Sequence, residues 1–473
     1  MKLKQFLKNR LFWLFLGFIV IYLIFLIAFR QYKDLWWDSA VYIGAGKYIF
    51  SGGTEGVFQP IIYPFLPLML GFFWFIGFKG FSIVYAGKFL ILIFSLLSLL
   101  LTYLIAKKLF DKRTGVIAMN ILFFNSLFFL FMFRIYTEMI TLCFMMASIF
   151  FTIKFSEDNK KGWLFLSALF LTILFLTKYT NITFLLILEV YIACFSYKSK
   201  KISSFFWFNL FFALLMLPFF IFNYVIFGNP FYMINIFQNY LVENLHTLYS
   251  FRSFPAVPRL LFENTDFIYF KSILYLFNIL LPFTCYGLYR IFQDKKNISL
   301  KLFMIIIPAI FIFLVAEISY LKQERYILAM FPMLAMITGY GLTKVKFKLV
   351  TFIMVVYICS ALVFSGHSLW AFSTDIEYAN LFINPPIKIS CENATTADPR
   401  TVINYKTNFP YDVFDEKWDG SKIRAHGSDC VFYFSCSKQV ESQLSEIKSL
   451  NYSLEYYSDR GSCYYAIFKK INS

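Results

Sequence analysis

Long apolar runs separated by short polar loops dominate the sequence. The runs lie at residues 11–29, 83–106, 114–132, 138–155, 162–177, 181–197, 204–227, 270–289, 300–320, 326–343 and 348–366. A helix of about 20 apolar residues is long enough to cross the hydrocarbon core of a bilayer. The pattern therefore predicts a polytopic α-helical membrane protein with about eleven spans.

Basic residues mark one side of the predicted membrane. The first apolar run follows the basic segment Met1–Arg10 and ends at Arg30 without a small-residue cleavage site, which predicts a retained anchor. Lys and Arg also gather in short loops such as Lys107–Arg113 and Lys198–Lys201. Because cytoplasmic loops carry an excess of Lys and Arg, the N-terminus is expected inside and the C-terminus outside.

Composition agrees with this class of protein. Of 473 residues, 59% are hydrophobic and only 15% are charged, and the mean hydropathy is +0.65. Soluble proteins are about 45–50% apolar and about 25% charged. The net charge of +17 sits in the short loops, so it indicates membrane orientation and not nucleic-acid binding.

The large polar segments all fall on the predicted outer side. They are the first outer loop at 30–81, a second loop at 228–269, and the tail. We expect a transmembrane catalytic domain over 1–368 and a soluble extracytoplasmic α+β domain over 369–473. The protein is thus expected to act on the extracytoplasmic face, with the plasma membrane as the favoured location.

The tail holds four of the eight cysteines. An even number in a short exterior domain predicts two disulfides, for which three pairings exist. Cys391–Cys463 with Cys430–Cys436 is the favoured pairing, four free thiols are the alternative, and a zinc site is disfavoured by the spacing.

Familiar soluble-enzyme motifs are missing from the sequence. It has no phosphate-binding glycine loop, no Gly-x-Ser-x-Gly elbow and no Asp-x-Asp pair that could hold the metal of a nucleotide sugar. A reaction outside the membrane would therefore use a donor other than a cytosolic nucleotide, and a lipid-linked donor fits.

Ionisable and tyrosine side chains stand at each outer turn. Such residues are costly near the bilayer and are candidates for function. They are Asp38, Tyr63, Arg134, Glu138, Lys178, Tyr179, Glu324, Arg325 and Tyr326. Simpler explanations stay open: Trp36 and Trp37 suit an interfacial aromatic belt, Lys178 and Arg325 could reach lipid headgroups, and Glu138 could favour a helix N-terminus.

Short motifs in a fixed order resemble the GT-C glycosyltransferases, in the group of protein O-mannosyltransferases and the lipid A aminoarabinose transferase. They are Trp-Asp-Ser-Ala-Val-Tyr at 37–42, Tyr-Pro-Phe-Leu-Pro at 63–67, Tyr-Thr-Glu at 136–138, Leu-Thr-Lys-Tyr at 176–179, Phe-Gly-Asn-Pro at 227–230 and Glu-Arg-Tyr-Ile-Leu at 324–328. Over roughly residues 1–345, the chain resembles a prokaryotic enzyme of the glycosyltransferase family 39 type. The tail has no such match.

This resemblance implies roles for particular residues. Asp38 and Glu138 are the expected catalytic residues: Asp38 matches the catalytic acid of the first outer loop and would be the general base, and Glu138 matches a second-loop acid and would orient the acceptor or the base. The second acid that often follows the first is replaced here by Ser39. Lys178, Arg325 and Tyr326 would bind the donor phosphate, and Tyr63, Arg134, Tyr179 and Glu324 are possible donor or acceptor contacts.

The implied reaction is an inverting transfer of a hexose such as mannose from a polyprenyl-phosphate donor to a lipid, glycan or protein acceptor. No cofactor is required, and a divalent metal is left open. A polytopic secondary transporter is the main alternative, although neither an internal repeat nor paired midplane charges favour it. A membrane scaffold whose tail binds a partner is the third hypothesis.

Overall fold

A computed structural model describes residues 10–56, 58, 62–243, 268–294, 298–318, 324–371, 393–396, 406–408, 429–435, 440–460 and 463–471. The chain divides into two compact units. Unit 1 comprises Met1–Phe29 and Leu90–Ala371, and unit 2 comprises Arg30–Phe89 and Phe372–Ser473.

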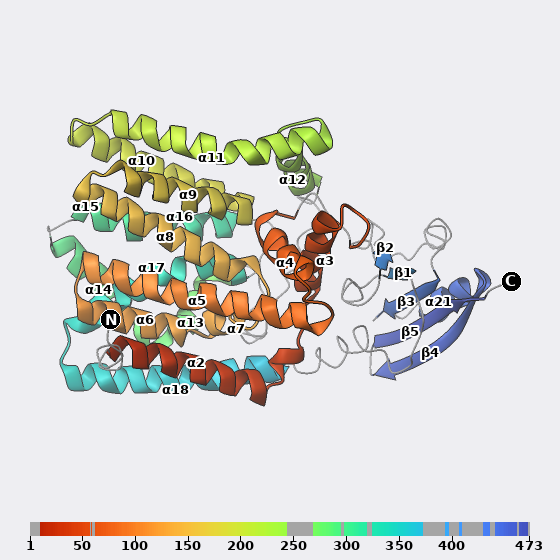
Figure 1. Ribbon diagram of the computed structural model, residues 1–473. Coiled ribbons are helices and arrows are strands. Elements are labelled where there is room, and N and C mark those ends of the chain that lie inside the picture. The colour runs from red at the N-terminus through yellow and green to blue at the C-terminus, as the bar shows by residue number, and fades with distance from the viewer. Residues whose placement is uncertain are drawn as a thin grey trace, which may run out of the picture. The chain divides into compact units, whose positions relative to one another are not determined.

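Unit 1 is built of helices that run alongside one another (Figure 1). They are α2 (Arg10–Ala28), most of α5 (Phe81–Leu109), α6 (Lys112–Phe123), α7 (Ser126–Phe131), α8 (Thr137–Asp158), α9 (Lys161–Thr177), η2 (Tyr179–Asn181), α10 (Ile182–Lys198), α11 (Ser203–Phe227), α12 (Tyr232–Glu243), α13 (Ile268–Phe277), η4 (Asn278–Leu280), α14 (Leu281–Gln293), α15 (Ile298–Lys301), η5 (Leu302–Ile306), α16 (Ile307–Ile318), η6 (Glu324–Met330), α17 (Phe331–Thr343) and α18 (Phe347–Ala371).

Over the residues that the structure describes, each of the eleven expected spans is helical for most of its length. Among the described residues, seven helical segments are long and apolar enough to cross a membrane, and they begin at Leu11, Phe81, Thr137, Ser203, Tyr269, Arg325 and Phe347. The other expected spans are shorter or broken. The run at 114–132, for example, divides into α6 and α7 because the Asn125 side chain accepts hydrogen bonds from the backbone N–H groups of Leu127 and Phe128 and begins a new helix. The protein is a multi-pass membrane protein.

Helix α8 lies in the interior of unit 1 and packs on α9. Most of its side chains are buried between Thr137 and Phe155. In this seam the Thr152 and Ser167 hydroxyls lie 2.7 Å apart, and the Ser148 hydroxyl donates to the Ser167 carbonyl at 3.0 Å. Small side chains let the two helices approach, and their hydroxyls are satisfied by each other, as lipid-embedded helices require. These contacts join the C-terminal half of α8 to α9.

Unit 2 contains a helical pair and a sheet. The pair is α3 (Trp37–Phe50) and α4 (Phe65–Phe75), and η1 (Gln31–Lys33) precedes it. Helices α3 and α4 cross at two glycines: a Cβ atom on Gly46 would lie 2.5 Å from the Pro67 carbonyl oxygen and 2.6 Å from the Gly71 nitrogen. Only glycine allows backbones to approach this closely.

The C-terminal sheet has the strand order β2-β1-β3-β5-β4. The strands are β1 (Asn393–Thr396), β2 (Lys406–Asn408), β3 (Cys430–Ser435), β4 (Tyr452–Arg460) and β5 (Cys463–Lys470), and α21 (Val440–Ser449) joins β3 to β4. Strand β1 is parallel to both neighbours, whereas β5 is antiparallel to β3 and β4. Val431, Tyr433, Ile447, Tyr452, Ala466 and Phe468 form its core. The expected α+β region is confirmed.

The favoured pairing of Cys430 with Cys436 stays a prediction. Cys430 opens β3, and the residue expected to pair with it follows that strand in the sequence. Cys391 and Cys436 lie outside the described residues, and the prediction of two disulfides stays a prediction.

Candidate functional site

A buried carboxylate joins two cations at one end of unit 1. The Lys178 Nζ lies 3.5 Å from the Glu138 Oε1, and the Arg325 Nε lies 3.7 Å from the same oxygen. The Glu138 side chain is only 5% exposed, and those of Lys178 and Arg325 are 22% and 16% exposed. We call these three residues, with Tyr136 and Tyr326, the Glu138 cluster. It unites three residues that the sequence places about 40 and 150 positions apart.

The local sequence explains why these groups stand at helix ends. Glu138 lies in the first turn of α8, where the helix dipole favours an acid. Lys178 is the residue that ends α9, where the dipole favours a cation. Arg325 lies at the start of η6. The dipoles of their own helices thus stabilise Glu138 and Lys178, whereas the start of a helix does not favour the Arg325 cation, which depends on its contact with Glu138.

Two tyrosine rings complete the cluster. The Lys178 Nζ lies 4.8 Å from the centroid of the Tyr326 ring, and the Arg325 Cζ lies 5.7 Å from it. The Arg325 Cζ also lies 5.5 Å from the centroid of the Tyr136 ring. Cations at these distances from a ring face are stabilised without being neutralised. Tyr326 therefore joins Lys178 and Arg325 as expected, whereas Tyr136 was not predicted as a site residue; its position just before the acid of an outer turn was the available signal.

Two cations and one carboxylate make up the charged groups of the cluster, and both cations contact the same carboxylate oxygen. The other oxygen, Glu138 Oε2, is buried without a hydrogen-bond partner among the described residues. Two cations at low exposure are suited to binding an anion, and Arg offers a planar fork for phosphate oxygens.

Three other expected residues lie in the same unit. Arg134 is buried, 1% exposed, in the turn between α7 and α8, with its guanidinium 5.8 Å from the Phe131 ring centroid. Tyr179 is buried in η2 and contacts the rings of Phe175 and Phe219, and burial raises the pKa of its phenol. Glu324 begins η6, and its side chain lies outside the described residues.

Asp38 and Tyr63 belong to unit 2. Asp38 is half-buried in the first turn of α3, a favourable place for an acid. Just before it, the Trp36 indole N–H donates to the Asp34 carboxylate at 2.8 Å and fixes the entry to the helix. Tyr63 is buried shortly before α4. The pair of helices α3 and α4 therefore presents Asp38 from a rigid element.

Unit 2 also holds a buried lysine that the sequence did not single out. Lys47 is 5% exposed in the last turn of α3. Burial lowers the pKa of its ammonium to about 8, and this effect is partly opposed by the attraction of Glu55. A single lysine in an amphipathic stretch carries no feature of the sequence that predicts its burial.

No group of three or more His, Cys, Asp or Glu side chains is placed to hold a metal ion in the described part of the chain. The need for a metal stays an open expectation.

The fold is that of the GT-C glycosyltransferases, which confirms the expected resemblance. The structure of ArnT from Cupriavidus metallidurans bound to undecaprenyl phosphate matches with a TM-score of 0.65 and 13% identity, over 98% of this chain and 99% of that chain. Its apo form matches with a TM-score of 0.62 and 13% identity, over 96% and 98%. The Archaeoglobus fulgidus oligosaccharyltransferase, tethered with an acceptor peptide, matches with a TM-score of 0.50 and 12% identity, over 94% of this chain and 70% of that one.

Part of the sequence also matches a known protein family. Residues 59–224, about a third of the chain, match the family of dolichyl-phosphate-mannose-protein mannosyltransferases. No curated protein matches the sequence. The family segment includes Glu138 and Lys178, and the fold likeness extends over both units.

Proposed function

We propose that this protein is a membrane glycosyltransferase that moves a sugar from a polyprenyl-phosphate donor to an acceptor on the extracytoplasmic face. The observation that carries the proposal is the largely buried Glu138 cluster, with two cations on one carboxylate, at the end of a helical unit with the GT-C fold. Undecaprenyl phosphate in the ArnT structure supports a phosphate-bearing lipid as the ligand. A hexose such as mannose is supported by the matching family.

Lys178 and Arg325 would bind the donor phosphate. When the bond from the anomeric carbon to the phosphate oxygen breaks, that oxygen gains negative charge. Fixed cations placed where charge develops lower the barrier, and removing one such group costs about 10²–10³ in rate in other enzymes. In this scheme Glu138 is a positioning residue that holds both cations, and it does not take a proton.

Asp38 would be the general base. It would accept the proton of the acceptor hydroxyl or amide as that atom forms its bond to the anomeric carbon, and the polyprenyl phosphate would leave with the electrons of the broken bond. Attack opposite the leaving phosphate inverts the anomeric centre. Such base catalysis contributes about 10²–10⁴-fold.

The test is sugar transfer from radiolabelled polyprenyl-phosphate hexoses by the purified protein, with a membrane extract as acceptor. We expect Asp38→Asn to lower kcat about 10²–10⁴-fold and Lys178→Met to lower it about 10²–10³-fold. Arg325→Lys keeps the positive charge but loses the planar guanidinium group, which can bind two phosphate oxygens at once. Arg113→Lys, near Phe347 and away from the cluster, is the matched control and should leave the rate unchanged.

Full transfer by folded Asp38→Asn would refute its role as base. Absence of transfer from every donor, combined with substrate uptake into liposomes containing the protein, would refute the enzyme class in favour of a transporter.

A further inference from the structure

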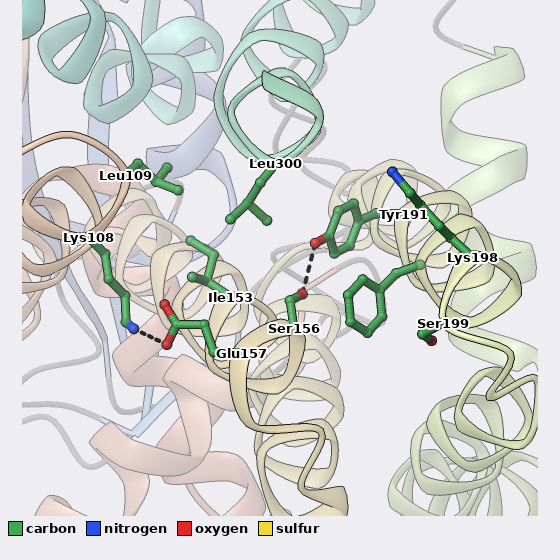
Figure 2. A pocket seen from close by; sticks show the side chains of 10 residues that line it. Lys108, Leu109, Ile153, Ser156, Glu157, Tyr191, Lys198, Ser199 and Leu300 are labelled. Atoms are coloured by element: carbon green, nitrogen blue, oxygen red, sulfur yellow. Dashed lines mark hydrogen bonds and ion pairs between the residues drawn. The ribbon is translucent and has the colours of Figure 1, made fainter. Parts of the chain in front are cut away.

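A second polar site lies at the other end of unit 1. Glu138 and Glu157 lie in the first and last turns of α8, and 19 residues of helix separate them by roughly 29 Å. Beside Glu157 is a pocket of about 440 Å³ (Figure 2). Its polar lining residues are Lys108, Ser156, Glu157, Tyr191, Lys198 and Ser199. They come from the ends of α5, α8 and α10, so this inner pocket is distinct from the Glu138 cluster.

The inner pocket joins a polar rim to an apolar wall. Lys108 and Glu157 form an ion pair on one side. In the middle, the hydroxyls of Ser156 and Tyr191 lie 2.8 Å apart. Figure 2 shows Lys198 on the other side of this pair. Ile153, Phe195 and Leu300 supply apolar surface beside these groups. This combination suits an amphiphile, with a polar head at the rim and a chain against the wall.

The charge at this end of the unit is strongly positive. Glu157 already pairs with Lys108, whereas Lys198 has no ion pair among the described residues and is exposed. The segments 107–113, 154–161 and 198–201 contain ten Lys or Arg and three Asp or Glu. The helix dipoles place partial negative charge at the C-termini of α5, α8 and α10, which reduces the positive charge here. Each of these ends contributes only about half a negative charge. An anion is therefore the favoured ligand.

We propose that the inner pocket binds the phosphodiester headgroup of an anionic membrane phospholipid. Lys198 and the Ser199 hydroxyl contact the phosphate, the Lys108–Glu157 pair closes one side, and an acyl chain lies against Phe195 and Leu300. Basic pockets between membrane helices at the cytoplasmic surface are suited to such headgroups. This site does not depend on the proposed transferase reaction.

The test measures binding of fluorescent phosphatidylglycerol to the purified full-length protein in detergent. We expect Lys198→Gln to weaken binding about fivefold, which corresponds to the roughly 1 kcal/mol that one Lys contributes near a membrane surface. Lys198→Glu should weaken binding further. Lys201→Gln is the matched control, because Lys201 is exposed three residues away and does not line the pocket. These exposed positions should not affect folding.

Two ligand comparisons separate the possible sources of the phosphate. Phosphatidylcholine with the same chains should bind at least fivefold more weakly, and millimolar glycerol phosphate should not displace the lipid. Equal binding by wild type, Lys198→Gln and Lys198→Glu would overturn the site. Displacement by glycerol phosphate would show a pocket for a soluble phosphate and would overturn the lipid assignment.

Discussion

The Glu138→Gln substitution tests whether the carboxylate fixes the two cations. At an effective dielectric constant of about 20, unit charges 3.5 and 3.7 Å apart attract by about 4.5 kcal/mol each. Desolvation offsets much of this, and removing one partner of a buried ion pair typically costs about 3–5 kcal/mol because the other charges stay buried. We therefore expect Glu138→Gln to lower the free energy of unfolding by roughly that amount.

The same helix offers a matched control. Glu157 also pairs with a lysine, but its side chain is 43% exposed. Exposed pairs contribute about 0.2–1 kcal/mol, so Glu157→Gln should change stability little. Denaturant titration of wild type and both variants in mixed micelles makes the comparison. Equal stability of the two variants would refute the reasoning.

Kinetics of Glu138→Gln separate a positioning role from proton transfer. Without the carboxylate, the local charge becomes more positive by one unit, so the donor phosphate and the product polyprenyl phosphate should both bind more tightly. We expect a lower KM for the donor and stronger product inhibition, together with a lower kcat caused by misplaced cations. A general base in this position would instead lose kcat with an unchanged donor KM, and that pattern would contradict the assigned role.

Two further predictions concern unit 2. The pKa of Lys47 is lowered from 10.5 to about 8, so the unfolded chain binds more protons between these values and stability should rise as the pH increases from about 8 to 10.5. Lys47→Met should abolish that rise and stabilise the protein at pH 7 by up to about 3 kcal/mol, and parallel unfolding profiles of wild type and variant against pH would contradict this. Gly46→Ala should destabilise the α3–α4 crossing by about 1–3 kcal/mol. Gly17→Ala, where an added Cβ meets nothing within 4 Å, should be neutral or slightly stabilising, and similar thermal melts for the two alanine variants would count against the close crossing.

The sequence predicted the helical segments well because each is governed by local apolar composition. The ends of α11, for example, fall within one residue of the expected bounds. The sequence did not predict where polar caps interrupt an apolar run, as at Asn125, because hydropathy averages over a single asparagine.

The composition of the Glu138 cluster was partly predictable. Glu138, Lys178 and Arg325 were identifiable as costly residues at outer turns, but their shared contact depends on how α8, α9 and η6 pack. The inner pocket left no motif, because its polar groups come one or two at a time from separate helix ends.

Packing accounts for Ser39, a position at which this chain departs from the motif of the GT-C enzymes that it resembles. These often have a second acid immediately after the first, and here that position holds a serine that is 2% exposed in α3. A carboxylate there would lose its hydration, whereas the neighbouring Asp38 is only half-buried and keeps part of its contact with solvent. Successive residues in the first turn of a helix point in different directions, so one position can face the site while the next faces the protein interior. The single acid of the Trp-Asp-Ser motif therefore agrees with a mechanism in which one base suffices and in which the cations of the Glu138 cluster, and not a second acid, assist departure of the phosphate.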